Sequence, residues 1–292
     1  MGTLDGKVAI ITGAGQGLGA AHAKLFAAEG ARHVLNDLGD GVEDVVAEIT
    51  ASGGEAVANR ASVSDWNAAK EMIEQAVDTY GDLHILVNNA GILRDKMSFN
   101  MEEDEWDAVV NVHLKGHFCP SRHAGTYWRS QSKAGHDAAR RIINTSSEAG
   151  LFGNAGQANY SAAKAGIAAL GIVVAREMAR YGVTCNTINP RARTRMTVNT
   201  FGADRLTGKE GEFDYNDPDN VSPWIAYLGT DEAGDITGQT FVCGGDSVML
   251  METWHRVGRI RKSKDRWTVA ELSQARKELF GDRSTGVAKF AM

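Results

Sequence analysis

Short apolar runs alternate with longer segments of helical periodicity along most of the chain, and this alternation limits the fold more than any other feature. Strands are expected at 8–11, 33–35, 56–58, 84–87, 141–144, 184–188 and 239–242, with helices at 18–28, 42–51, 66–80, 103–128 and 158–180 between them. Strands that alternate with helices form βαβ units and a parallel sheet. Because such crossovers are right-handed, the sequence predicts a doubly wound α/β sheet of about seven strands, with helices on both faces and a ligand crevice at the carboxyl ends of the strands.

The alternation ends near residue 246, which divides the chain into two expected parts. Residues 1–246 form the sheet domain, with a polar surface insertion at 130–136 and a substrate lid at about 190–218. Long irregular segments in a compact domain are usually functional loops. Residues 247–292 form an extension that we expect to pack on the domain or on a partner subunit.

The extension carries the signals of an ordered helix. Thr268 and Glu271 have the spacing of a capping box, Leu272 and Leu279 follow at helical spacing, and Gly281 stands at the expected C-terminal cap. The sequence therefore predicts a tail helix with an apolar stripe.

Composition and charge exclude several classes of protein. The 31 basic and 37 acidic residues give a net charge of -6, so no broad basic field is available for nucleic acid or anionic lipid. The three cysteines, Cys119, Cys185 and Cys243, are too far apart for a disulfide framework or a zinc site. The first residues do not read as a secretory signal, the last do not match a peroxisomal address, and no uncharged stretch reaches the roughly 20 apolar residues of a membrane helix. We expect a cytoplasmic protein that needs no metal.

A glycine-rich turn follows the first expected strand. The segment Thr12–Gly19 reads T-G-A-G-Q-G-L-G, the pattern T-G-x-x-x-G-x-G with one additional glycine. Glycines allow tight turns and let backbone N–H groups approach a pyrophosphate at the positive end of the next helix. Such a turn by itself need not bind a ligand. Between a strand and a helix it predicts a dinucleotide site comprising Gly13, Gly15, Gln16, Gly17, Leu18 and Gly19.

Asp37 ends the second expected strand. A carboxylate there accepts hydrogen bonds from the adenosine ribose 2′-hydroxyl and repels a 2′-phosphate, which favours NAD over NADP. Neither Gln16 nor Leu38 supplies a cation for that phosphate. Two alternatives stay open, because Arg32 is near in sequence and Asp37 is also a common turn residue before Gly39.

Tyr160 and Lys164 are four residues apart, so a helix presents both on one face. Ser147 lies 13 residues earlier, just past an expected strand. Oxidation of an alcohol needs a base for the hydroxyl proton, which Tyr160 would provide, and a donor for the developing carbonyl oxygen, which Ser147 would provide. Lowering a tyrosine pKa from about 10 to about 7 requires about 4 kcal/mol, which one cation at about 4 Å supplies at an effective dielectric near 20. The alternative is an exposed tyrosine and a solvated lysine on an amphipathic helix.

These motifs together resemble the short-chain dehydrogenase/reductase family over roughly residues 4–246. The resemblance adds the segment 88–91, Asn-Asn-Ala-Gly, and Asn111 to the motifs above. It implies a Rossmann-type fold and a catalytic tetrad in which Asn111 holds a water that relays a proton from Lys164. It also implies cofactor contacts from Tyr160 and Lys164 and from Ser62, Val63, Asn89, Ala90, Gly91, Pro190 and Thr194. Ser62 is a departure, since many members of the family carry aspartate there against the adenine.

A finer resemblance is to the dehydrogenase portion of the peroxisomal multifunctional enzymes of type 2, which are 3-hydroxyacyl-CoA and 17-beta-hydroxysteroid dehydrogenases. The similar stretches are 36–39, 91–96, 153–160, 195–197 and the tail near Trp254 and Trp267. This resemblance implies NAD, an acyl-CoA thioester with a 3-hydroxyl or 3-keto group, and a homodimer or homotetramer.

Three weaker signals allow more than one interpretation. Arg191, Arg193 and Arg195 could meet CoA phosphate or belong to a solvated lid. His113 and His117 are spaced to hold a metal, but without a third ligand a core or interface position is favoured. The side chains of Met249, Met251, Trp254 and Trp267 could line an acyl pocket, although packing is the better interpretation.

The leading hypothesis is an NAD-dependent 3-hydroxyacyl-CoA dehydrogenase, with bulky or sterol-derived acyl chains among its candidate substrates. A second is a 3-oxoacyl-carrier-protein reductase or a steroid or alcohol dehydrogenase, and Asp37 argues against its NADPH-driven form. A third is a catalytically silent dinucleotide-binding protein. Retention of Ser147, Tyr160 and Lys164 together argues against the third.

Overall fold

The computed structural model describes residues 2–194, 196, 198, 211–252, 254–263 and 265–287. The chain forms two compact units, Met1–Met251 and Glu252–Met292, and each is described by itself. The expected lid at 190–218 lies only partly within the described residues.

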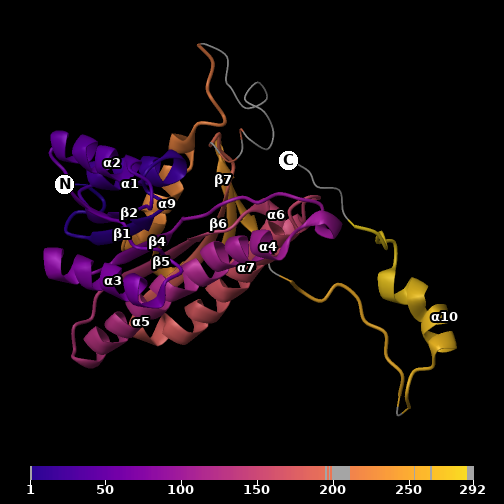
Figure 1. Cartoon of the computed structure of the whole chain (residues 1–292). Helices are drawn as coiled ribbons and strands as arrows, with labels where there is room; N and C mark the ends of the chain where they lie inside the picture. The colour runs from indigo at the N-terminus through magenta and orange to yellow at the C-terminus, as the bar shows by residue number, and fades with distance from the viewer. Residues whose placement is uncertain are drawn as a thin grey trace. The chain divides into compact units, whose positions relative to one another are not determined.

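The first unit is built on a Rossmann-like sheet of eight strands in the order β3-β2-β1-β4-β5-β6-β7-β8 (Figure 1). Neighbouring strands are parallel except for the last pair, β7 and β8. The strands are β1 (Val8–Thr12), β2 (Arg32–Asn36), β3 (Glu55–Asn59), β4 (Ile85–Asn88), β5 (Arg140–Thr145), β6 (Val183–Pro190), β7 (Thr240–Gly244) and β8 (Ser247–Met251). The strand order reverses between β1 and β4, and a ligand crevice forms at such a switch point.

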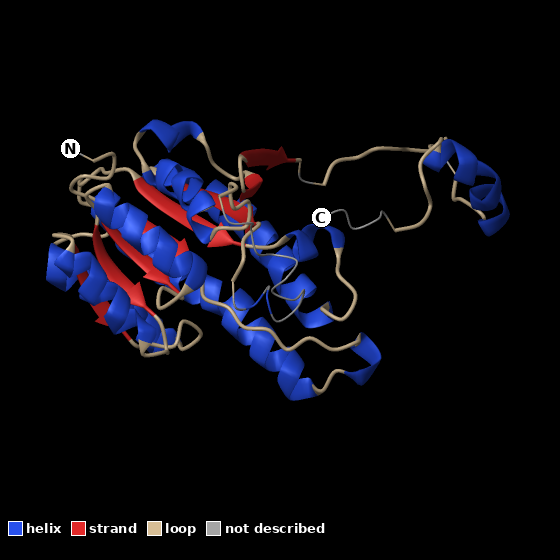
Figure 2. Cartoon of the chain, turned by 90° about the horizontal axis from the view of Figure 1, so that it is seen from above, coloured by secondary structure: helices blue, strands red, loops and turns tan. Residues whose placement is uncertain are grey.

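Helices cover both faces of the sheet (Figures 1 and 2). One face carries α1 (Gly17–Ala28), α2 (Gly41–Ala51) and α9 (Ser222–Gly229). The other carries α3 (Trp66–Tyr80), α5 (Gly116–Lys133) and α7 (Ala158–Met178). The shorter elements α4 (Glu103–Val110), the π-helical turn η2 (Asn111–Lys115) and α6 (Glu148–Phe152) lie before α5 and α7.

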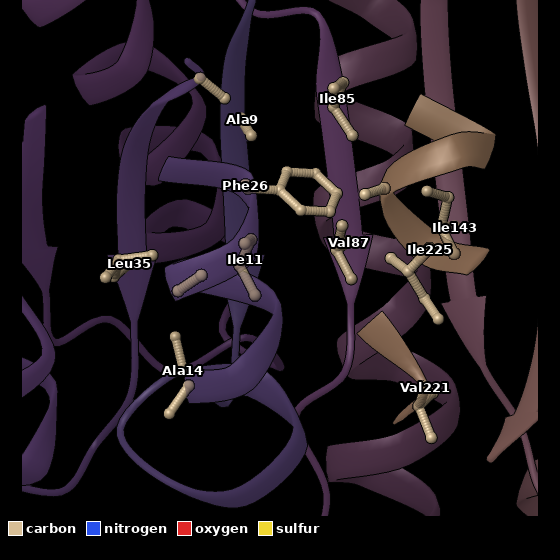
Figure 3. Close-up of a cluster of buried hydrophobic side chains, with 14 of the residues drawn as sticks. Ala9, Ile11, Ala14, Phe26, Leu35, Ile85, Val87, Ile143, Val221 and Ile225 are labelled. Carbon is tan, nitrogen blue, oxygen red and sulfur yellow. The ribbon is translucent and has the colours of Figure 1, made fainter. Parts of the chain in front are cut away.

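Each face of the sheet has its own apolar core. Figure 3 shows the first, in which Phe26 of α1 and Ile225 of α9 pack over Ile11, Ile85 and Val87 of the central strands. All five side chains are fully buried, and each contributes about 1.5–3 kcal/mol to stability when it leaves water. Strands β1 and β4 are buried along their whole length because both faces are covered, which explains their continuous apolar sequences.

Three sequence-based expectations for this unit need correction. The sheet has an eighth strand, because Gly245 with φ 56° and Asp246 form a two-residue turn that folds β8 back on β7. The expected domain boundary at 246 therefore falls inside a hairpin. The expected insertion at 130–136 begins as the last turn of α5, which continues to Lys133.

Helix α7 is apolar because it covers one face of the sheet. With the turn after it, at Ala158–Tyr181, it is the one helix among the described residues that is long and apolar enough to cross a membrane, with a mean hydropathy of 1.3. It packs on β5 and β6 and buries Lys164 within its first two turns. These properties are those of a helix that covers a sheet.

The second unit contains α10 (Val269–Phe280), which confirms the expected tail helix. The Thr268 backbone N–H donates to Glu271 Oε2 at 2.8 Å, and the Glu271 N–H donates to Thr268 Oγ1 at 3.3 Å, so the capping box is complete. Lys262 Nζ also donates to Glu271 Oε1 at 2.7 Å. These contacts lower the pKa of Glu271 to about 2, the Lys262 hydrogen bond most strongly.

Candidate active site

A pocket of about 370 Å³ opens at the carboxyl ends of the central strands. It brings together most of the residues that the sequence analysis selected, from seven separate stretches of chain. The selected residues that line it are Gly13, Gln16, Gly17, Leu18, Asp37, Ser62, Val63, Asn89, Ala90, Gly91, Ser147, Tyr160, Lys164, Pro190 and Thr194. Lining residues that the sequence analysis missed include Leu38, Ala61, Ile92, Val112, His113, Thr145, Ser146, Ala192 and Met196.

The glycine-rich turn between β1 and α1 has the geometry of an anion cradle. Gly13 and Gly17 have positive φ angles of 65° and 53°, and a Cβ at Gly19 would collide with the Gly13 carbonyl oxygen. Among the described residues no side chain caps the start of α1, so its first N–H groups are available to an anion. Gly15 and Gly19 shape the turn from behind and do not line the pocket. The turn therefore fits the pyrophosphate of a dinucleotide.

The loop after β4 is fixed to the glycine-rich turn. Thr12 Oγ1 accepts hydrogen bonds from the backbone N–H groups of Asn89 at 2.9 Å and Ala90 at 3.1 Å. Asn88 points the other way and donates to Ser121 Oγ and to Asn144 Oδ1, both at 2.9 Å. The segment 88–91 thus joins the pocket wall to the central sheet.

Asp37 lines the pocket with both carboxylate oxygens already hydrogen-bonded. Oδ2 accepts from the Gly15 N–H at 3.0 Å, and Oδ1 accepts from the Gly39 N–H at 2.9 Å. The carboxylate is therefore held in one orientation at the end of β2. Asp37 can therefore stabilise the turn before Gly39 and still bind a cofactor ribose. Each carboxylate oxygen that accepts one hydrogen bond has a lone pair left for a second donor.

The cations near Asp37 differ from those that the sequence indicated. Arg32 lies at the amino end of β2, with its guanidinium carbon 5.4 Å from the centre of the Tyr80 ring, and is therefore remote from Asp37. Arg60 is the nearer cation and donates to Asp40 Oδ1 and Glu43 Oε2, both at 2.7 Å. Its guanidinium is thus paired with two carboxylates of the chain.

Ser147, Tyr160 and Lys164 converge through the packing of α6 on α7. Ser147 is the N-cap of α6, and its Oγ accepts from the Ala149 N–H at 3.2 Å. A Cβ at Gly150 would lie 2.7 Å from the Lys164 carbonyl carbon, so only glycine allows this approach of the two helices. Close packing therefore sets the serine beside the tyrosine.

Lys164 is buried, with 2% of its surface exposed, and donates to the Thr145 carbonyl oxygen at 2.6 Å. Its Nζ is 5.5 Å from the centre of the Tyr160 ring. Burial lowers the pKa of Lys164 to about 7. The side chain is therefore a cation whose charge is easily lost near neutral pH.

The Tyr160 hydroxyl is a weaker acid in this structure than the sequence argument assumed. Burial raises the pKa of Tyr160 to about 12, a hydrogen bond with Ser147 lowers it, and the charge of Asp95 raises it. Bringing this pKa from about 12 to about 7 requires about 7 kcal/mol, more than the roughly 4 kcal/mol expected from one nearby cation. Lys164 alone is thus insufficient, because the phenol is desolvated and the ammonium is directed at Thr145.

Asn111 lies behind the pocket wall rather than in it. It begins the π-helical turn η2, and its Nδ2 donates to Ser64 Oγ at 2.9 Å. A π-helical turn often marks a functional position in a helix. Its expected part in a proton relay stays a prediction.

His113 is a feature of the site whose importance the sequence did not reveal. Its ring stands edge-on to Tyr160, with centroids 5.1 Å apart and planes at 88°, and its Nε2 lies 2.7 Å from the Ile92 carbonyl oxygen. Burial lowers the pKa values of His113 and His117, so both rings are neutral near pH 7. The spacing of these histidines therefore reflects core packing.

Two of the three lid arginines, Arg191 and Arg193, have partners within the chain. Arg191 makes a bidentate pair with Glu148, through Nε at 2.8 Å and Nη2 at 2.7 Å, and Arg193 Nη2 lies 2.7 Å from Asp214 Oδ2. Arg195 lies outside the described residues. Contact of these arginines with CoA phosphate stays a prediction. To bind Arg191 or Arg193, the phosphate would have to compete with the carboxylate that each of them already contacts. Met249 and Met251 lie on the edge strand β8, away from the pocket lining.

Comparison with known proteins identifies a family and several similar enzymes. The family model described as short chain dehydrogenase matches residues 7–204. Hydroxyacyl-CoA dehydrogenase ChsB1 of Mycobacterium tuberculosis is 44% identical over 288 residues, which cover 96% of this chain and 90% of that protein. The peroxisomal multifunctional enzyme type 2 of Mus musculus is 35% identical over 303 residues, 97% of this chain and 39% of that longer protein.

Two further similarities concern a reductase and a solved structure. A 3-oxoacyl-[acyl-carrier-protein] reductase of a Synechocystis species is 40% identical over 254 residues, 86% of this chain and all of that protein. The crystal structure of a short chain dehydrogenase from Mycobacterium avium is 48% identical, with a TM-score of 0.90 and coverage of 100% of both chains.

Proposed function

The chain belongs to the short-chain dehydrogenase family, and from this membership and the pocket we propose that it oxidises the 3-hydroxyl of an acyl-CoA thioester with NAD. Members of this family are oxidoreductases that bind a nicotinamide dinucleotide. The observation that carries the proposal is the convergence of Ser147, Tyr160 and Lys164 on one pocket that Asp37 also lines. The match to hydroxyacyl-CoA dehydrogenase ChsB1 over 96% of the chain supports the substrate class.

In the proposed reaction each of the three converging side chains has one task. Tyr160 accepts the hydroxyl proton of the substrate, and Ser147 donates a hydrogen bond to the same oxygen as it becomes a carbonyl. Lys164 contributes positive charge near the phenol. The bound oxidised nicotinamide would receive the hydride and add a second positive charge beside the pocket. Asn111 would keep a water in reach of Lys164, through which the proton leaves.

Asp37 supports NAD rather than NADP as the cofactor. Its fixed carboxylate can accept from ribose hydroxyls, and a 2′-phosphate would meet an anion there. Arg60, which is near Leu38, is neutralised by Asp40 and Glu43.

Replacement of Asp37 with serine is expected to raise the KM for NAD about 10- to 100-fold, since a hydrogen bond to a charged group contributes about 1.5–3 kcal/mol. The KM for NADP should fall at the same time, because the repelling charge is gone. The matched control is Asp44→Asn, which removes an exposed carboxylate on α2. An unchanged ratio of NADP to NAD use in Asp37→Ser would contradict the cofactor assignment.

A panel of substrates tests the reaction itself. We expect NADH to appear fastest with 3-hydroxyacyl-CoA thioesters, among which straight and bulky sterol-derived acyl chains should both be tried. Steroids and free alcohols complete the panel. If only the free alcohols were oxidised, the assignment to acyl-CoA would be wrong.

The match to the 3-oxoacyl-[acyl-carrier-protein] reductase favours one alternative, reduction of a carrier-protein thioester. That reaction would be expected to prefer NADPH, which Asp37 opposes. Two results together would establish the alternative. The enzyme would use NADPH in preference to NADH, and it would reduce a 3-oxoacyl carrier protein faster than the corresponding CoA thioester.

We further propose that the enzyme is cytoplasmic and acts as a homodimer or homotetramer. Cys119, Cys185 and Cys243 are all free and buried, as is usual in a reducing compartment. Light scattering of the purified protein would give the number of subunits.

A further inference from the structure

The ring of Tyr160 depends on its neighbours for its orientation. Rotation of a tyrosine ring about its last side-chain bond has only broad energy minima, so the side chain does not fix the plane of its own ring. The phenol oxygen stays on the rotation axis, but the plane in which it forms hydrogen bonds turns with the ring. Proton transfer needs that plane aligned with the substrate, and poor alignment in an active site can cost about 100-fold in rate. Another group must therefore hold the ring.

His113 is a neighbour that can hold it. The two rings meet edge-on, with centroids 5.1 Å apart and planes at 88°, which is a favoured geometry for an aromatic pair. His113 is fully buried and lines the same pocket as Tyr160. A turn of the tyrosine ring away from its present plane would break this edge-on contact.

The loop after β4 fixes the imidazole in its turn. Nε2 of His113 lies 2.7 Å from the Ile92 carbonyl oxygen and 3.1 Å from the Ile92 nitrogen. The loop lies directly against the ring, because a Cβ at Gly91 would collide with Cε1 of His113. Thr12 holds the same loop from the other side, through the backbone N–H groups of residues 89–90. A continuous series of contacts thus runs from the first strand to the imidazole.

The π-helical turn η2 directs His113 toward the pocket. Val112 and His113 both line the pocket, whereas Asn111, at the start of the turn, does not. Single π-helical turns of this kind are frequent at functional positions. The irregular backbone therefore serves to place the imidazole on the pocket wall.

His113 is a costly choice for a buried position. The Ile92 carbonyl oxygen accounts for Nε2, but Nδ1 is buried and has no hydrogen-bond partner among the described residues. A buried polar atom without a partner lowers stability, and an apolar side chain would avoid that loss. Choices that oppose stability are expected where a site needs them. The need here is for a flat ring that can also be anchored at its far end.

We propose that His113 is a positioning residue, which is anchored on Ile92 and sets the plane of the Tyr160 phenol. The proposal rests on the proposed function only for the role of Tyr160 as the base. It goes beyond that function by identifying what orients the base, and it holds for any alcohol that the pocket accepts.

His113→Leu removes both the ring and its anchor. We expect kcat to fall about 10- to 100-fold, while the KM for the substrate and the affinity for NADH stay within about twofold, because alignment matters in the transition state rather than in binding. The matched control is His33→Leu, which removes a fully buried histidine of β2 that does not line the pocket. This control should keep the parent kcat. A parent-like kcat in His113→Leu would overturn the proposal.

His113→Gln separates the anchor from the ring. A glutamine amide is flat and can still donate to the Ile92 carbonyl oxygen, so this variant should recover part of the kcat that His113→Leu loses. Equal kcat values in the two variants would show that the contact with Ile92 does not orient the base, and the proposal would then be wrong.

The rate at which the Tyr160 ring flips can be measured without any substrate. Tyrosine labelled with carbon-13 at its ε positions gives resonances whose exchange reports these flips, and Tyr160→Phe identifies the signals of residue 160. We expect the flips to become about tenfold faster in His113→Leu, since an edge-on aromatic contact contributes free energy of that order. His33→Leu should leave the flip rate at the parent value. An unchanged flip rate in His113→Leu would also overturn the proposal.

The proposal and the proposed function can fail separately. Lack of turnover with every 3-hydroxyacyl-CoA would refute the function. The kcat comparison would then use whichever alcohol of the panel is oxidised, and the flip rate would still be measured on the protein alone. Faster flips in His113→Leu would support the role of His113 in that event.

Discussion

Tyr160→Phe is expected to reduce kcat/KM for the substrate about a thousandfold or more, while the affinity for NADH stays within about twofold of the parent value. The substitution removes the phenolic oxygen that, once deprotonated, accepts the substrate proton in the proposed reaction. It keeps the aromatic ring, so the edge-on contact with His113 and the fold of α7 should persist. Steady-state kinetics and fluorescence titration with NADH measure the two effects.

The control for this substitution is Tyr181→Phe. Tyr181 follows α7, and its hydroxyl accepts a hydrogen bond from Arg129 Nε at 3.2 Å, away from the pocket. We expect this variant to keep the parent activity. If Tyr160→Phe oxidised substrate as fast as the parent, the assignment of the base would have to be abandoned.

Lys164→Met is expected to reduce kcat/KM about 100- to 1,000-fold and to move the acid limb of the pH profile to higher pH. The direction follows from charge, because an ammonium favours the phenolate and its loss raises the pKa of Tyr160 further above its usual value. The roughly 4 kcal/mol available from one nearby cation corresponds to about a thousandfold in rate, and solvent entering the opened space would recover part of it.

The same substitution should also affect stability in a measurable way. The Thr145 carbonyl oxygen loses its 2.6 Å donor, and a buried acceptor left without a partner costs about 1–3 kcal/mol. Thermal unfolding and the pH profile can be measured on one preparation, with Lys70→Met, at an exposed lysine on α3, as the control. An acid limb that stayed in place would show that Lys164 acts on the substrate or cofactor rather than on the phenol.

The family and the pocket lining were predictable from the sequence because they depend on local spacing. The family model confirms the resemblance drawn from the glycine-rich turn, Ser147 and the Tyr160–Lys164 pair. Each motif follows a strand or starts a helix, and strands of one parallel sheet bring their carboxyl ends to the same edge. Of the cofactor positions selected, Gly15 and Gly19 shape the turn without lining the pocket.

Other parts of the site depend on neighbours that are distant in the sequence. Arg32 looked like the cation near Asp37, yet it lies at the other end of its strand, and Arg60, which follows β3, comes closer. The pair between Arg191 and Glu148 joins residues 43 positions apart. No local pattern indicates such contacts, because side-chain pairing is decided by the path of the whole chain.

The sequence alone therefore determined the order of most strands and helices, the glycine-rich turn and the side chains that we propose as reacting groups, since each depends on the spacing of a few consecutive residues. Only the tertiary structure decided the eighth strand, the edge-on contact between His113 and Tyr160 and the pKa values of the tyrosine and Lys164. The physical reason is that desolvation and Coulomb interactions sum over all groups that surround a side chain in space. Those groups arrive from segments that meet only when the sheet and its helices have assembled.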